Sequence, residues 1–76
     1  MEKTIKEYIR RRWAYGEETA YAWLHATIGG LPYRTLRAAG KAWRFPEKKR
    51  VHLEEDLRGH VESVASMRIL NLLEER

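Results

Sequence analysis

The stretch LPYRTLRAAGKAWRFPEKKRVHL, residues 31–53, decides the fold expected of this 76-residue chain. The proline at its second position suits the first turn of a helix, where its missing N–H would be unpaired in any case. The residues that follow divide at helical spacing into an apolar side and a basic side. The apolar side holds Leu36, Gly40 and Trp43, and the basic side holds Arg34, Arg37 and Lys41. We predict a helix over 32–41 with a cationic outer face.

The second half of the stretch predicts a β-hairpin over 43–53. The segments WRF (43–45) and RVHL (50–53) each alternate large apolar with polar residues, and PEKK between them has turn chemistry. Proline at position 46 argues against a helix there, because it lacks an N–H donor and clashes with the preceding turn. The tip of this hairpin would carry Lys48 and Lys49, with Arg50 directly behind them.

Helices are expected on both sides of this stretch. Apolar residues recur at helical spacing over 4–13 and 17–28, and glycines at 16 and at 29–30 end the two segments. A long helix is expected over 54–75. Its last two turns are apolar on more sides than one internal contact needs, which suggests a homodimer or a cooperative assembly through this C-terminal helix. The apolar stripes contain the expected core residues Ile5, Tyr8, Ile9, Trp13, Ala20, Leu24, Ile28, Leu57, Val61, Val64, Ala65, Ile69 and Leu72.

The expected fold class is therefore mostly α with one small β-hairpin. A chain of this length forms one domain at most. Its parts would be an N-terminal helix over 1–14, a helix-turn-helix with a β-hairpin wing over 15–53, and a C-terminal helix over 54–76.

Positive charge is concentrated in the middle of the chain. Residues 31–52 contain seven basic residues against one acidic residue, whereas residues 53–76 contain three basic and six acidic ones. A compact cationic segment attracts a polyanion and releases its counterions on binding. A solvated basic surface with no partner is the alternative.

Other function classes have little support. The chain has no cysteine. The spacing of its three histidines and of the nearby acids matches no compact set of metal ligands, so we expect no metal. These residues are His25, His52, His60, Glu54, Glu55 and Asp56. We find no catalytic motif and expect no enzyme and no cofactor. The charged N-terminal residues 1–12 do not resemble a signal peptide, and no apolar run suits a membrane span, so a cytoplasmic protein is expected.

Four runs of the sequence carry a family resemblance: EETAYAWL (17–24), LPYRTLR (31–37), GKAWRFP (40–46) and RVHLEEDL (50–57). In this order and spacing they resemble the excisionase-like (MerR-type) winged-helix family, over residues 15–62. The resemblance implies duplex DNA binding, with the second helix in the major groove and the wing against the backbone or the minor groove. By position, Tyr33, Arg34, Thr35 and Arg37 match the family's base- and phosphate-facing helix residues, and Lys48, Lys49 and Arg50 match its wing. Lys41 and Arg44 complete the expected DNA-binding set.

These expectations describe a small architectural or regulatory DNA-binding protein, of the kind found in phages and mobile elements and acting in transcription regulation or DNA recombination. It would act at the nucleoid or in the cytoplasm of a host. Two alternatives stay open. One is a small protein-binding module or inhibitor, including a viral one, that uses the basic face and the apolar C-terminal helix. The other is an RNA- or single-strand-binding protein in which Trp43 or Phe45 stacks on bases.

Overall fold

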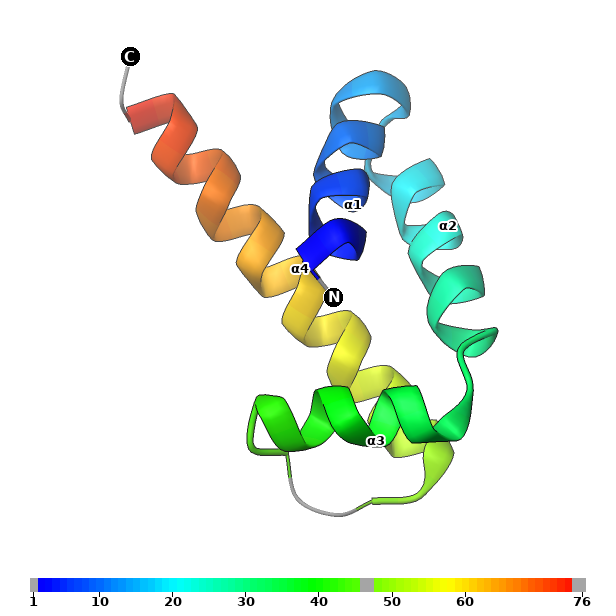
Figure 1. Cartoon of the computed structure of the whole chain (residues 1–76). Coiled ribbons are helices and arrows are strands. Elements are labelled where there is room, and N and C mark those ends of the chain that lie inside the picture. The colour runs from blue at the N-terminus through cyan, green and yellow to red at the C-terminus, as the bar shows by residue number, and fades with distance from the viewer. Residues whose placement is uncertain (1, 46–47, 75–76) are drawn as a thin grey trace.

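The computed structural model describes residues 2–45 and 48–74, and within these ranges it contains four helices. Their bounds are α1 Glu2–Tyr15, α2 Glu17–Gly29, α3 Tyr33–Ala42 and α4 Arg50–Glu74. Figure 1 shows α1 and α2 as an antiparallel pair, with α3 lying across the lower end of the molecule. The long α4 contacts each of the other three helices.

A single glycine separates α1 from α2. Gly16 has φ 96° and ψ 166°, a backbone region that is essentially restricted to glycine. Its carbonyl accepts a hydrogen bond from the Ala20 N–H at 3.2 Å, which begins the hydrogen-bond pattern of α2. The chain can therefore reverse direction in one residue and lay α2 directly against α1.

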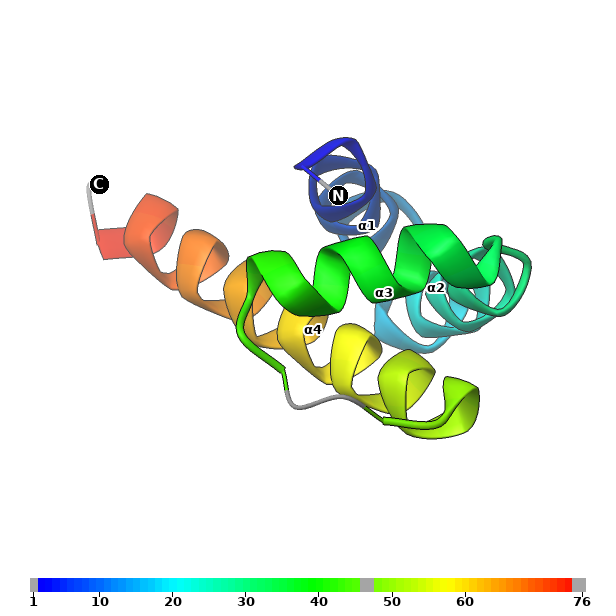
Figure 2. The same ribbon diagram turned by 60° about the horizontal axis from the view of Figure 1, so that its bottom comes forward.

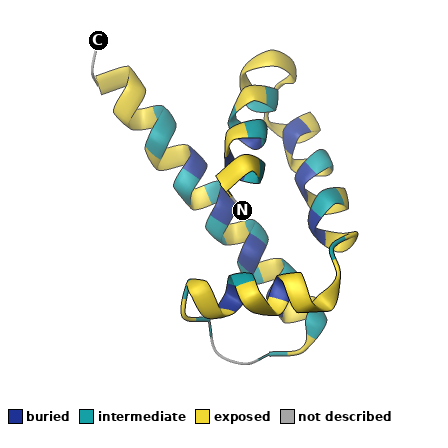
Figure 3. Cartoon of the chain, in the orientation of Figure 1, coloured by how far each residue is buried: buried dark blue, intermediate teal, exposed yellow. Residues whose placement is uncertain are grey.

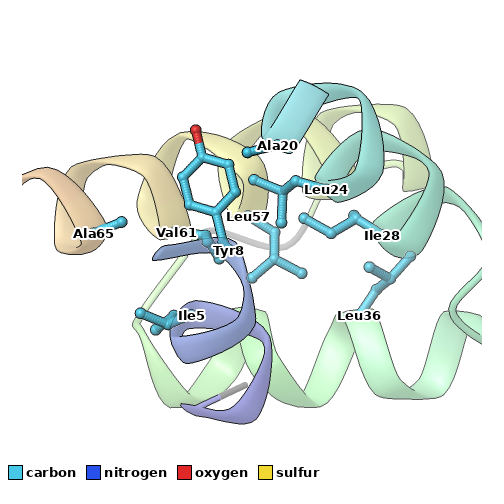
Figure 4. Close-up of a cluster of buried hydrophobic side chains, with 9 residues drawn as sticks. All are labelled: Ile5, Tyr8, Ala20, Leu24, Ile28, Leu36, Leu57, Val61 and Ala65. Carbon is cyan, nitrogen blue, oxygen red and sulfur yellow. The ribbon is translucent and has the colours of Figure 1, made fainter. Parts of the chain in front are cut away.

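The core lies where the inner faces of all four helices meet. Tyr8 and Leu24 are fully buried there and contribute the largest side chains of the α1–α2 pair. Figure 4 shows these residues converging with side chains from α3 and α4. The buried cluster consists of Ile5, Tyr8, Ala20, Leu24, Ile28, Leu36, Leu57, Val61 and Ala65. Most of the predicted core is thus confirmed, but Trp13 is 62% exposed and Leu72 is 52% exposed, so the predicted apolar stripes run past the core at the C-terminal ends of α1 and α4.

The predicted hairpin wing over 43–53 is wrong. No strand occurs among the described residues, and α4 begins at Arg50, where the second strand was expected. Pro46 and Glu47, the first half of the expected turn, lie outside the described residues. The winged helix-turn-helix fold is therefore not the fold of this chain, whereas its mostly helical character is confirmed.

The helix outcompetes the hairpin because it buries Leu53. This side chain lies four residues before Leu57 and eight before Val61, so starting α4 at Arg50 extends the buried stripe by one turn. Arg50 also pairs with Glu54 at the i,i+4 spacing that stabilises helices. An isolated two-stranded hairpin is marginal in water and would have no third strand to pair with.

Candidate nucleic-acid interface

The segment α2–α3 has the layout of two helices joined by a tight turn. The turn consists of the three residues Gly30, Leu31 and Pro32. The N–H of Gly30 bonds to the carbonyl of Ala26, and the N–H of Leu31 bonds to that of Ile28, both at 3.1 Å. Pro32 was expected to be the first residue of this helix, but it is the N-cap residue that precedes α3, and its carbonyl accepts the Thr35 N–H at 2.9 Å.

One face of α3 packs on α4, through Leu36 and Gly40. Both residues are buried. A β-carbon on Gly40 would lie 3.1 Å from Cδ2 of Leu53, which shows how closely the two helices approach at this point. Figure 2 shows α3 lying across the first half of α4. The opposite face of α3 is turned away from the core.

That outer face carries the predicted cations. Arg34, Arg37 and Lys41 are all exposed, and at 100° per residue they fall within an arc of about 60°. Tyr33 and Thr35, also exposed, flank Arg34 on either side of this arc. Figure 3 shows the outer side of α3 as mostly exposed residues. The structure thus brings together on α3 the helix residues that the sequence analysis selected. We call Arg34, Arg37 and Lys41 the α3 cationic face.

The protein leaves part of this face unpaired. In the ranges 2–45 and 48–74, the side chains of Arg34 and Lys41 form no ion pair or hydrogen bond with another protein group. Arg37 shares the face and also interacts within the chain. Two guanidinium or ammonium groups are therefore available for an external anion.

The cations expected at the tip of the wing have a different environment. Lys48 Nζ lies 2.5 Å from Asp56 Oδ2, and Arg50 Nε lies 2.8 Å from Glu54 Oε1. Two of the three predicted wing contacts are therefore engaged by carboxylates of α4. Lys49 is exposed and, within the described residues, has no such partner.

Arg50 performs a structural role that the sequence analysis missed. Its Nη2 donates hydrogen bonds to the carbonyls of Gly29 at 3.1 Å and Leu31 at 2.7 Å. These carbonyls belong to the end of α2 and the turn that follows, so Arg50 ties that turn to the first residue of α4. The i,i+4 spacing of Arg50 and Glu54 was the available signal for a helix here, but the carbonyl partners lie about twenty residues away and leave no local trace.

The arginines of α1 are also engaged. Arg10 and Arg11 both bind Glu7, and this pairing lowers the pKa of the Glu7 carboxyl from 4.5 to about 2. The Arg11 guanidinium lies over the ring of Trp23, with 4.7 Å between Cζ and the ring centroid, and Arg12 lies over Tyr8. Arg34 and Lys41 of the α3 cationic face therefore differ from these three arginines in having no ion-pair, hydrogen-bond or ring partner within the described residues.

The aromatic residues after α3 pack against one another. The rings of Trp43 and His60 stack with centroids 4.1 Å apart, and Phe45 meets His60 edge-on at 5.9 Å. These contacts give Trp43 and Phe45 an internal partner in His60, so both rings take part in packing between α4 and the end of α3. The two other histidines, His25 and His52, are exposed, and the described residues contain no group of three or more side chains that could hold a metal.

Comparisons with known proteins do not assign the chain to a family. No family model, curated protein or solved structure matches it. Within the described residues, no helix is both long enough and apolar enough to cross a membrane. The function is therefore inferred from the geometry and charge of the α3 face.

Proposed function

We propose that the chain is a duplex DNA-binding protein that inserts the outer face of α3 into the major groove. The observation that carries this proposal is the pair Arg34 and Lys41, exposed on one side of a helix and unpaired within the described residues. An α-helix fits the width of the major groove, and arginine can donate two hydrogen bonds to guanine O6 and N7.

The two ends of α3 would contact different parts of the DNA, the N-terminal end the base edges and the C-terminal end the backbone phosphates. In helix-turn-helix proteins the first residues of the second helix contact base edges. Tyr33, Arg34 and Thr35 occupy these positions in α3. Lys41, two turns further on, would bind a backbone phosphate, which positions the protein without reading sequence. The short turn after α2 keeps the end of that helix beside the same groove.

The charge distribution supports a polyanionic partner. The segment 31–52 has seven basic residues and one acidic residue, so binding would displace several counterions and weaken as salt rises. The resemblance to the excisionase-like family supports the same partner for α2 and α3 only, since the described residues of the expected wing contain no strand. We infer a regulatory or architectural binding protein and not an enzyme, of the kind that phages and mobile elements encode, acting in the cytoplasm.

Fluorescence anisotropy with labelled duplex DNA at low and moderate salt tests this proposal. The double variant Arg34→Ala/Lys41→Ala should lose affinity at least tenfold, because each lost base or phosphate contact costs about 1–3 kcal/mol. The control, Lys3→Ala/Lys6→Ala, removes the same charge from exposed positions of α1 and should bind nearly as well. Absence of salt-dependent binding by the wild-type chain would reject the proposal and favour a protein partner for the basic face.

A second surface suggests that the DNA-binding unit is a dimer. Met67, Leu70, Leu72 and Leu73 are each more than half exposed. They lie on the last turns of α4, which Figure 1 shows extending beyond α1, α2 and α3. Trp13 and Ile69 line a shallow hollow with Arg12, which continues the apolar surface onto α1. Apolar patches of this kind are typical of interaction sites.

We propose that this end of α4 packs against the same end of a second copy. Two copies related by a two-fold axis would present two α3 helices to successive half-sites on one DNA duplex. Size-exclusion chromatography with light scattering should show a dimer that Leu70→Glu/Leu73→Glu converts to a monomer. A wild-type chain that stays monomeric at high micromolar concentration would reject the dimer, while DNA binding by the monomer would still be measurable.

A further inference from the structure

The C-terminal end of α3 is closed by a complete Schellman motif. The N–H of Phe45 bonds to the carbonyl of Gly40 at 2.8 Å, and the N–H of Arg44 bonds to that of Lys41 at 3.1 Å. Between these two bonds Arg44 takes the left-handed conformation, with φ 60°. This pair of hydrogen bonds around one left-handed residue defines the motif.

An arginine is an unfavourable choice at the left-handed position. Glycine usually occupies it, because a β-carbon approaches the following carbonyl oxygen in this conformation. Among the described residues Arg44 is the only one other than glycine with a positive φ. Backbone strain of this kind persists where the surrounding structure imposes it, and it occurs preferentially at functional sites.

In the part of the chain that the structure describes, the Arg44 side chain makes no contact that would compensate for the strain of its left-handed backbone. The motif is held by backbone hydrogen bonds and by the packing of Phe45 against Gly40, where a β-carbon would lie 3.8 Å from Phe45 Cβ. The Arg44 side chain is exposed, and within the described residues it forms no hydrogen bond, ion pair or ring contact. A glycine would suit this backbone conformation better, and no contact within the described residues accounts for an arginine at position 44.

We propose that Arg44 is a phosphate-binding residue that the Schellman motif holds at the end of α3. This assignment rests on the proposed DNA binding by α3. Arg44 follows Lys41 by three residues and its N–H bonds to the Lys41 carbonyl, so its backbone lies directly at the end of the helix that carries the α3 cationic face. A guanidinium binds phosphate through two parallel hydrogen bonds, which suits a contact that fixes the register of α3 on the duplex. The ligand is the DNA backbone phosphate beside the groove that α3 enters.

The variant Arg44→Gly separates stability from binding. It removes the steric cost and the cation together, so the melting temperature should rise by about 2–5 °C while affinity for DNA falls. The probe is a labelled duplex of random sequence, two helical turns long. We expect affinity to fall about fivefold and the slope of log affinity against log salt to decrease by about one, as for the loss of one phosphate contact.

Two further variants distinguish the effect of the Arg44 charge on DNA affinity from the effect of its backbone conformation on stability. Arg44→Ala keeps the unfavourable conformation and should lose affinity as Arg44→Gly does, without the rise in melting temperature. Arg44→Lys keeps the charge and should retain the salt slope of the wild type. Wild-type affinity and salt slope in Arg44→Gly, alongside lost binding in Arg34→Ala/Lys41→Ala, would overturn the role of Arg44 and leave the α3 proposal standing. No binding by the wild-type chain would overturn both.

Discussion

Two groups of cations come from the same basic segment but have opposite environments. On α3, Arg34 and Lys41 extend from an exposed face and have no partner within the described residues. At the start of α4, Lys48 and Arg50 are paired with Asp56 and Glu54. The first group is available to a ligand, whereas in the second group Lys48 is paired within the chain and Arg50 ties the turn after α2 to the start of α4.

The difference arises from where the carboxylates lie. Residues 31–45 contain no acidic residue, so the face of α3 has no neighbour in its own helix that could neutralise it. The first two turns of α4 contain Glu54, Glu55 and Asp56, of which Glu54 pairs with Arg50 and Asp56 pairs with Lys48. The number of basic residues therefore predicts attraction to a polyanion, whereas the location of the acids decides which cations stay available to a ligand.

The largest effect is expected from reversing the charge of the α3 face. Arg34→Glu/Lys41→Glu replaces two attractive contacts by repulsion from phosphate and should weaken duplex binding by at least about 100-fold. Stability to urea should change by no more than about 0.5 kcal/mol, because both positions are exposed. Anisotropy and urea titrations measure the two quantities. An equal loss of DNA affinity in Lys3→Glu/Lys6→Glu would show that binding depends on net charge and not on the α3 cationic face.

A smaller effect, and one on stability instead of binding, is expected from Arg50→Ala. The variant removes the hydrogen bonds to the Gly29 and Leu31 carbonyls and the pair with Glu54. Because the Arg50 side chain is 41% exposed, solvent reduces the loss to about 1–2 kcal/mol. Urea titration measures it, and DNA affinity of the folded variant should change little. A drop in affinity with unchanged stability would place Arg50 on the DNA.

The neighbouring lysines 48 and 49 provide the sharpest matched pair. Lys49→Ala removes an exposed cation without a partner in the described residues and should lower the salt slope of DNA binding by about one if it contacts phosphate. Lys48→Ala removes a cation already neutralised by Asp56 and should leave the slope unchanged. Its effect on stability should stay below about 1 kcal/mol, as for most half-exposed ion pairs. A slope change in Lys48→Ala would contradict the division between the two groups.

The smallest effect concerns the paired arginines of α1. Arg10 and Arg11 lower the pKa of Glu7 from 4.5 to about 2. The folded state therefore gains stability from this carboxylate above pH 4.5, and the gain is lost as the pH falls from 4.5 towards 2. Glu7→Gln should flatten the stability profile in this window without changing DNA binding at neutral pH. An identical dependence of stability on pH in wild type and variant would show that the pairing of Glu7 with Arg10 and Arg11 does not stabilise the fold.

The errors of the sequence analysis have a common cause. Alternating residues and Pro46 made 43–53 resemble a hairpin, because both signals act over only a few residues. The burial of Leu53 in line with Leu57 and Val61, and the carbonyl partners of Arg50, depend on elements distant in the chain. Trp13 shows the same limit, since its helical spacing marked it as core, but α1 extends past the surface it packs on.

The amino-acid sequence alone determined the helices over most of their length, most of the core, and the common face of Arg34, Arg37 and Lys41 on α3. These features follow from helical periodicity and local charge, which require no knowledge of the packing. Only the tertiary structure decided that residues 50–53, the expected second strand of the wing, belong to α4, that Lys48 and Arg50 are engaged internally, and that Arg44 is left-handed. The physical reason is that burial and hydrogen bonding depend on contacts between helices that are distant in the chain. The free energy of these contacts can override the local conformational preference of a short segment.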